Sequence, residues 1–342
     1  MHFELILPGL NWPTGPGPHP ASRSGLPALG TLLGFASHRW DEQCTLEALL
    51  TRRFGMHGPI PHARLRRLGE MDGTDAPGHW LCCDPVHLHF ARDKLLLADA
   101  SGLAITRVEA DTLMAGLNET FGDIGQFEAP APDRWYLRVA EAPVPRFHPI
   151  ADVNGRPVQL FLPEGDDCPR WARLSNEIEV WLYNHPINEA REANGQRRIN
   201  GIWLWGAGET DLRTRPPVQR ILANAPYPRG LARHAGIASG TAEHFQPSPE
   251  TTLAVVDTLH RPLLHMTPDA WTAALETLEK DWFAPLLQAL KAGQLKHLRI
   301  TVPGDRHLLE LEIGQRGLWK FWRKPQGLDA LLATAPSLDS PS

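Results

Sequence analysis

The chain has 342 residues, of which 42% are hydrophobic and 21% charged. This length and apolar content allow a sizeable buried core and exclude a generally disordered chain, and they leave room for one large domain with a second, smaller lobe. The formal net charge of -5 supplies no chain-wide basic field, so we expect neither nucleic acid nor a membrane as a partner.

Cysteine usage and the N-terminal residues indicate the compartment. The four cysteines, Cys44, Cys82, Cys83 and Cys168, form no C-x-x-C pair and no ladder of spacings, so neither a zinc knuckle nor a disulfide framework is predicted. Residues 1–8 include an acidic residue among too few apolar ones for a signal peptide, and no apolar run approaches the roughly 20 residues of a membrane helix. We therefore expect a cytoplasmic protein.

The first elements of the chain indicate a buried strand followed by core helices. Residues 2–7 form an apolar run typical of a strand, and a loop rich in proline and glycine follows over residues 8–20. Apolar residues at three- and four-residue spacing then predict helices over residues 26–33 and 45–54. A strand that runs into a long loop often carries the functional site of an α/β protein.

A smaller α+β lobe is predicted over residues 76–160. Two strands joined by a short turn occupy residues 86–98, and a further strand is predicted at 135–139. Between them, Thr106 and Glu109 have the spacing of a capping box that opens a helix. Strands and one helix in this order are typical of a compact α+β unit.

After residue 160 strands and helices alternate, which indicates a mostly parallel sheet with helices on both faces. The predicted elements are helices at 171–182 and 267–290, the latter with a kink at Pro285, and strands at 202–205, 252–257 and 297–302. We therefore predict an α/β core made of residues 1–75 and 161–333, with the lobe of residues 76–160 inserted and residues 334–342 forming a disordered tail.

The densest group of polar residues follows the helix at 171–182. It consists of His185, Asn188, Arg191, Asn200, Gly206 and Gly208. These residue types suit an anionic, hydroxylated ligand, because Arg191 can bind a carboxylate or phosphate with two parallel hydrogen bonds and the glycines let the backbone approach closely. The alternative is a helix stop at His185-Pro186 followed by a buried tryptophan strand.

This motif, with Gly195 and the run Trp203-Leu-Trp-Gly-Ala-Gly208, resembles that of archaeal-type cofactor-independent phosphoglycerate mutases. Only Ile187 departs, where the family has valine. Weaker similarity extends along most of the chain, and within the family the resemblance is to a divergent bacterial group named either as phosphoglycerate mutases or as regulatory proteins of a pathogenicity-factor cluster. The resemblance implies an alkaline-phosphatase-like fold.

The chemistry that the resemblance implies uses two divalent ions, manganese or magnesium, and a serine or threonine nucleophile. Two metals neutralise the phosphoryl oxygens and stabilise the leaving oxygen, so aspartate and histidine ligands must cluster at strand ends. In the family the first strand ends in Asp-Gly, whereas this chain has Pro8-Gly9, which lacks the metal-binding carboxylate. The region of the nucleophile offers Thr14, Ser22 and Ser24 without an assured match.

The remaining metal ligands of the family have partial counterparts here. Asp257, His260 and His265 resemble part of one ligand group, and Asp305 and His307 resemble an Asp-His pair separated by an arginine. The sequence names no certain cofactor, and manganese or magnesium would bind only if the protein is an active enzyme.

The leading hypothesis is a phosphoglycerate-mutase-like protein with degenerate metal and nucleophile positions, which binds a phosphorylated or carboxylated small molecule in a regulatory role. One alternative is an active metal-dependent mutase or phosphatase whose relocated ligands converge on the ions. Another is a structural module that binds a protein partner. A small anionic metabolite and a protein are thus the two expected kinds of partner.

Three further features have structural interpretations. His87 and His89 alternate on one strand and indicate an exposed strand face rather than a metal site. The basic run of residues 64–67 predicts a solvated helix face. Residues 318–324 alternate aromatic and basic side chains, which favours a closing strand packed by Trp319 and Trp322.

Overall fold

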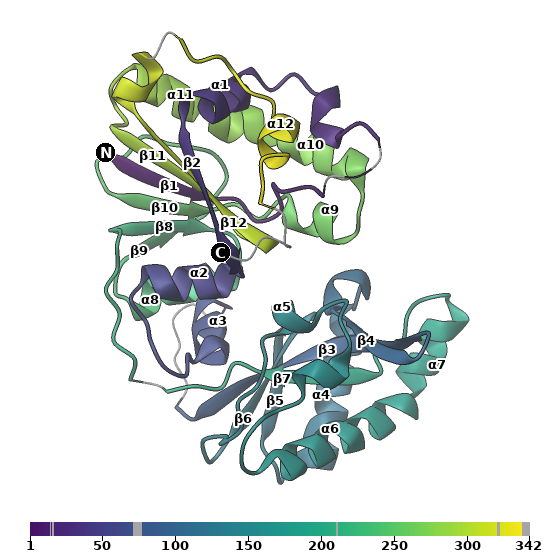
Figure 1. Cartoon of the computed structure of the whole chain (residues 1–342). Helices are drawn as coiled ribbons and strands as arrows, with labels where there is room; N and C mark the ends of the chain where they lie inside the picture. The colour runs from purple at the N-terminus through teal and green to yellow at the C-terminus, as the bar shows by residue number, and fades with distance from the viewer. Residues whose placement is uncertain (14, 16, 71–76, 210, 320–321, 337–342) are drawn as a thin grey trace. The chain divides into compact units, whose positions relative to one another are not determined.

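The computed structural model describes residues 1–13, 15, 17–70, 77–209, 211–319 and 322–336. The chain forms two compact units, one made of Met1–Gly55 with Thr214–Ser342 and the other of Met56–Arg213 (Figure 1). The inserted unit is therefore wider than the 76–160 expected from the sequence, because the strand at Gly201–Trp205 pairs within it rather than within the core. Most of the expected tail, residues 337–342, lies outside the described residues.

The first unit is built on a seven-stranded sheet with the order β2-β12-β11-β1-β10-β8-β9. Its strands are β1 (His2–Ile6), β2 (Ser37–Cys44), β8 (Arg220–Ala223), β9 (Ala238–Gly240), β10 (Thr252–Val255), β11 (His297–Val302) and β12 (Gly304–Gly314). All neighbours from β11 to β9 are parallel, while β12 and β2 are antiparallel. The predicted α/β class with a mostly parallel sheet is confirmed.

Helices cover both faces of this sheet (Figure 1). The helices of the first unit are α1 (Pro27–Phe35), α2 (Leu46–Arg53), α8 (Pro226–His234), α9 (His260–Leu264), α10 (Pro268–Leu278), α11 (Ala284–Lys291) and α12 (Leu328–Leu332), with 3-10 turns at Pro20–Arg23 and Gln315–Trp319. Along β1, Leu5 and Leu7 join the core under α1, α10 and α11, while the intervening Ile6 is buried on the other face. A strand buried on both faces is typical of a parallel sheet.

The long helix predicted over residues 267–290 is interrupted where the kink was expected. A π-helical turn, Glu279–Phe283, separates α10 from α11, and Pro285 is the second residue of α11. The turn has a structural use, because the buried carboxylate of Glu279 accepts hydrogen bonds from the amides of Ala28 (2.6 Å) and Leu29 (3.0 Å). Glu279 thereby satisfies free N–H groups at the start of α1.

The second unit is an antiparallel sheet with the order β4-β3-β6-β5, to which β7 adds along β3. Its strands are β3 (His79–Ala91), β4 (Lys94–Ala98), β5 (Gln126–Ala131), β6 (Arg134–Val139) and β7 (Gly201–Trp205). Its helices are α3 (His62–Glu70), α4 (Arg107–Phe121), α5 (Ile150–Val153), α6 (Cys168–Tyr183) and α7 (Pro186–Ala193), with 3-10 turns at Ala100–Gly102 and Val158–Phe161. The predicted capping box of Thr106 and Glu109 opens α4.

Two sequence interpretations were wrong. Arg66 and Arg67 on α3 are 8% and 5% exposed, so the basic run is not a solvated face. Trp319 and Trp322 are 79% and 67% exposed and lie in or after a 3-10 turn, so they do not pack a closing strand. Residues 320 and 321 between them lie outside the described residues. None of the helices in the described ranges combines the length and apolar character needed to cross a membrane.

Candidate functional site

The topology of the first unit brings several predicted site residues to one edge of its sheet. β1, β8, β10 and β11 are parallel, so their carboxyl ends meet at the same edge. Pro8 and Gly9 follow β1, Asp257 lies two residues beyond β10, and Asp305 lies just after the turn that joins β11 to β12. This is the edge at which an open α/β sheet ordinarily binds its ligand.

The end of β1 is packed by protein atoms. Gly9 has φ +89°, and a Cβ atom there would lie 2.6 Å from the carbonyl carbon of Leu259. The indole N–H of Trp271 on α10 donates to the carbonyl oxygen of Gly9 over 2.7 Å. Pro8 has no side-chain atom that can bind a metal. The end of β1, where the resemblance implies a metal-binding position, is therefore part of the apolar interior.

The loop after β1 is fixed by aromatic contacts with the same tryptophan. The ring of Trp12 lies 5.4 Å from that of Trp271, and His19 meets Trp271 edge-on at 5.8 Å. Burial lowers the pKa of His19 below its usual value. A Cβ atom on Gly304 would lie 2.0 Å from Nδ2 of Asn11, so this loop also fits closely against the turn into β12.

The five predicted metal ligands do not gather into a site. His260 is the first residue of the short helix α9 and His265 directly follows it, and both are exposed. Asp257 accepts the amide N–H of His260 through its backbone carbonyl (2.9 Å). Asp305 is exposed, and His307 packs edge-on against Trp40 at 5.9 Å.

Across the described residues, no group of three or more histidine, cysteine, aspartate or glutamate side chains is arranged to hold a metal. With Pro8 and Gly9 at the end of β1, the residues present do not fit a two-metal centre.

The hydroxyl groups considered as nucleophiles are engaged where the structure describes them. The Ser22 hydroxyl donates to the carbonyl of His19 (2.7 Å), and the Ser24 hydroxyl donates to the carboxylate of Glu276 (2.7 Å). Thr14 lies outside the described residues.

The polar motif that follows α6 lies in the second unit and stabilises its fold. His185 caps α7, since its Nδ1 accepts the amide N–H of Ile187 over 3.3 Å. Asn188 is fully buried, and its amide nitrogen donates to the carbonyls of Leu182 and Ile199 over 2.8 Å each. Its oxygen accepts the Ile199 amide N–H. Asn188 thus joins the end of α6 to the segment before β7.

Arg191 is buried in the same way, and protein acceptors bind its guanidinium. Its side chain is 1% exposed and forms an ion pair with Glu109 over 2.8 Å. It also donates to the carbonyl oxygens of Arg197 (2.8 Å) and Leu103. The guanidinium therefore links the start of α4 to the end of α7. This structural role explains the arginine in the motif without requiring a bound anion.

Asn200 and the two glycines also have structural partners. The Asn200 side chain accepts the amide N–H of Leu88 (2.7 Å) and donates to the Leu88 carbonyl (2.8 Å), as a neighbouring strand would. Cβ atoms on Gly206 and Gly208 would lie 2.9 Å from the Ala63 nitrogen and 2.3 Å from the Ile60 carbonyl carbon. The two glycines leave room for the backbone at the start of α3 and just before it. The structure thus supports the alternative in which this motif is a helix stop followed by a buried strand.

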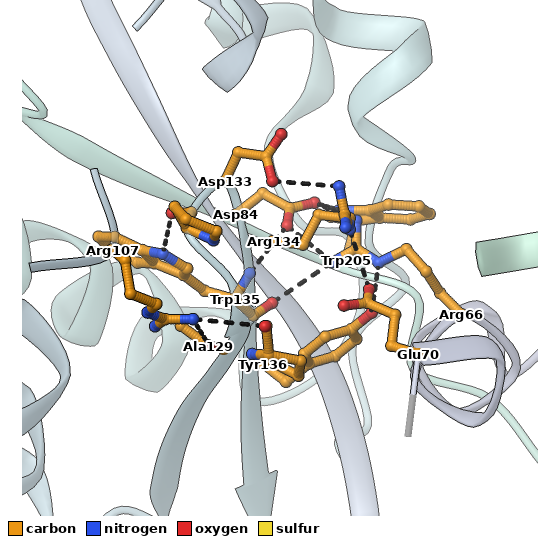
Figure 2. Close-up of polar contacts among 12 residues, drawn as sticks. Arg66, Glu70, Asp84, Arg107, Ala129, Asp133, Arg134, Trp135, Tyr136 and Trp205 are labelled. Carbon is orange, nitrogen blue, oxygen red and sulfur yellow. Dashed lines mark hydrogen bonds and ion pairs between the residues drawn. The ribbon is translucent and has the colours of Figure 1, made fainter. Parts of the chain in front are cut away.

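A buried ionic network in the second unit was not predicted from the sequence (Figure 2). Arg66 donates to both oxygens of Asp84 over 2.8 and 2.7 Å, and to the hydroxyl of Tyr136 over 2.8 Å. Trp205 also donates to Asp84 (2.8 Å), and Tyr136 donates to Glu70 (2.6 Å). The available signal was Asp84 itself, since a charged residue directly after the apolar run 80–83 implies a buried partner.

Comparisons with known proteins find similarity over part of the chain. No protein-family model matches the chain. It is 37% identical over 60 residues to a 2,3-bisphosphoglycerate-independent phosphoglycerate mutase of Methanothrix thermoacetophila, covering 18% of this chain and 15% of that protein. It is 32% identical over 116 residues to a second such mutase of Methanothermobacter thermautotrophicus, covering 33% of this chain and 29% of that protein. The chain thus shows weak homology to archaeal mutases and matches only a minor part of their length.

Solved structures extend the likeness in fold alone. The PH0037 protein from Pyrococcus horikoshii matches with a TM-score of 0.51 and 14% identity, covering 92% of this chain and 87% of that one. A cofactor-independent phosphoglycerate mutase from Thermoplasma acidophilum has a TM-score of 0.44 and 16% identity, with 92% and 89% covered. The match to PH0037 agrees with the predicted α/β fold class.

Proposed function

We propose that this protein is a phosphoglycerate-mutase-like protein that has lost two-metal phosphoryl transfer and serves as a regulatory or binding protein. The observation that carries the proposal is the end of β1, where Pro8 offers no carboxylate and the carbonyl of Gly9 accepts a hydrogen bond from Trp271. Two metal ions need several carboxylates and imidazoles around them to offset their charge. An apolar, closely packed strand end cannot supply these donors.

The second support is the distribution of the remaining candidate ligands. His260, His265 and Asp305 are exposed, and within the described part of the chain they belong to no group of three or more side chains that could hold a metal. The resemblance to a bacterial group that includes regulatory proteins agrees with a role that does not need turnover.

An anionic ligand of the polar motif has less support. The anion-binding hypothesis depended on Arg191, and this guanidinium already has three protein acceptors. Withdrawing it toward a phosphate would leave Glu109 without its buried counter-charge. We therefore place the regulatory function outside this motif.

The experiment is conversion of 3-phosphoglycerate to 2-phosphoglycerate by the purified chain of 342 residues, with excess manganese or magnesium and a chelator-treated control. We expect no difference between the metal-loaded and chelated samples. Chelator-sensitive turnover that disappears in Asp257→Asn and persists in the control Asp93→Asn would overturn the proposal and favour relocated ligands. The Asp93→Asn control changes a carboxylate in the β3–β4 turn of the other unit.

A further inference from the structure

The second unit carries a groove that the polar motif only touches at its edge. The groove has a volume of about 690 Å³ and lies beside the C-terminal ends of α4 and α6. Its apolar lining comes from Phe121, Ile124, Val180, Trp181 and Pro186. This volume falls within the roughly 300–1,000 Å³ of small-molecule sites.

Trp181 is held in place by the way the two helices approach. A Cβ atom on Gly116 of α4 would lie 2.5 Å from Cζ2 of the Trp181 indole, so only glycine leaves room for this ring. The ring of His185 lies 4.7 Å from the indole at an interplanar angle of 48°. Because Gly116 and His185 both confine it, Trp181 offers a preformed aromatic surface.

The charged residues that line the groove are acidic. Asp123 and Glu177 are the charged residues among those that line it, and the described lining includes no lysine or arginine. Arg173 pairs with Glu177 over 2.8 Å, but its side chain is 80% exposed, so water weakens this pair. Nδ1 of His185 accepts the amide N–H of Ile187, and burial lowers the pKa of this ring, so His185 adds no fixed positive charge.

We propose that this groove binds an organic ammonium compound that has an aromatic or branched apolar body. The apolar body would contact Val180 and Trp181, and the ammonium group would lie near Asp123 and Glu177. An indole face attracts a cation, and the two carboxylates add charge of the opposite sign. Both carboxylates would repel an anion, and no lysine or arginine in the described lining would offset this repulsion.

This inference does not depend on the proposed loss of mutase activity. The groove lies wholly in the unit of residues 56–213, and the predicted metal ligands all lie in the other unit. Mutase turnover could therefore be present or absent without changing the result expected at the groove.

The test uses three probes of similar shape and different charge with the full chain: 2-phenylethylammonium, 2-phenylethanol and 3-phenylpropionate. Calorimetry and the ¹H–¹⁵N signal of the Trp181 indole, assigned through Trp181→Phe, report binding. We expect the ammonium compound to bind roughly tenfold or more tightly than the alcohol, and the carboxylate to bind most weakly. Equal or tighter binding of 3-phenylpropionate, or no shift with any probe, would overturn the proposal.

Variants connect the charge preference to the two carboxylates. Asp123→Asn and Glu177→Gln should each weaken 2-phenylethylammonium binding by about threefold to tenfold and leave 2-phenylethanol unchanged. Glu141→Gln, which removes an exposed carboxylate that does not line the groove, is the matched control. If the double variant Asp123→Asn/Glu177→Gln keeps full affinity for the ammonium probe, the carboxylates do not select the ligand and the proposal fails.

Discussion

Trp271 donates its indole N–H to the carbonyl oxygen of Gly9 over 2.7 Å, and this bond joins α10 to the first residues beyond β1. In an open α/β sheet these residues usually face the ligand. Here the indole of Trp271 is fully buried, and Trp12 and His19 pack against the same ring. The residues just beyond β1 are therefore packed into the hydrophobic core in this protein.

Trp271→Phe should lower the free energy of unfolding by about 1–3 kcal/mol, because the ring is retained while the buried Gly9 carbonyl loses its donor. Trp40→Phe removes a weaker, exposed bond to Thr334 (3.3 Å) and should cost less. Urea unfolding followed by tryptophan fluorescence measures both. Equal losses in the two variants would show that the Gly9 bond adds no particular stability.

Gly9→Ala tests the close fit at the same point. The new Cβ would lie 2.6 Å from the Leu259 carbonyl carbon, and φ +89° is unfavourable for alanine, so we expect a loss of about 2–4 kcal/mol in stability. The control is Gly15→Ala, because a Cβ there meets no atom within 4 Å. A measured loss similar to that of the control would mean that the strand end has room for a side chain.

Local sequence signals predicted much of the fold. Strand β1, the capping box of α4 and the interruption before Pro285 follow from contiguous residues, so they could be predicted without knowing the tertiary structure. Strand β2 was missed because its side chains are polar and largely exposed, which hides the alternation of a half-buried strand. The pairing of β7 with β3 joins residues more than a hundred positions apart. Local sequence patterns do not reveal such a pairing, so the predicted end of the inserted unit at residue 160 was too early.

The candidate site shows the same division. The sequence marked His185 and Arg191 as unusual, but their roles depend on partners elsewhere in the chain. Arg191 binds Glu109, 82 positions earlier, and the same Glu109 closes the capping box of α4. The sequence does not show whether an arginine has a carboxylate partner in the fold. A structural role and a ligand-binding role of Arg191 could therefore not be distinguished from the sequence.

Arg191→Ala should therefore act on stability. Removing the arginine takes the counter-charge from Glu109, which keeps its bonds to Thr106, and takes a donor from the Leu103 and Arg197 carbonyls. We expect a loss of about 3–5 kcal/mol. Arg198→Ala breaks an exposed pair with Glu192 and should cost at most about 1 kcal/mol. Thermal and urea unfolding provide the comparison. A stable Arg191→Ala protein that loses affinity for 3-phosphoglycerate would restore the anion-site hypothesis.

The pH dependence of stability should include a contribution from His62. Burial lowers the pKa of this histidine from 6.5 to about 4, and its ring lies 6.0 Å from that of Trp205. The folded state holds His62 neutral, whereas the unfolded chain takes up a proton below its pKa of 6.5. The stability is therefore present above pH 6.5 and is lost as the pH falls from 6.5 toward 4, by about 2 kcal/mol between pH 7 and pH 5.

His62→Phe removes the ionisable group and keeps an apolar ring beside Trp205. Its stability should therefore fall less than that of the wild type between pH 7 and pH 5, by about the same 2 kcal/mol, when urea unfolding is measured at both values. The control His2→Gln alters an exposed ring and should follow the wild-type pH profile. If His62→Phe and the wild type lose stability in parallel, the imidazole of His62 is protonated in the folded protein or exchanges with solvent, and burial does not hold it neutral.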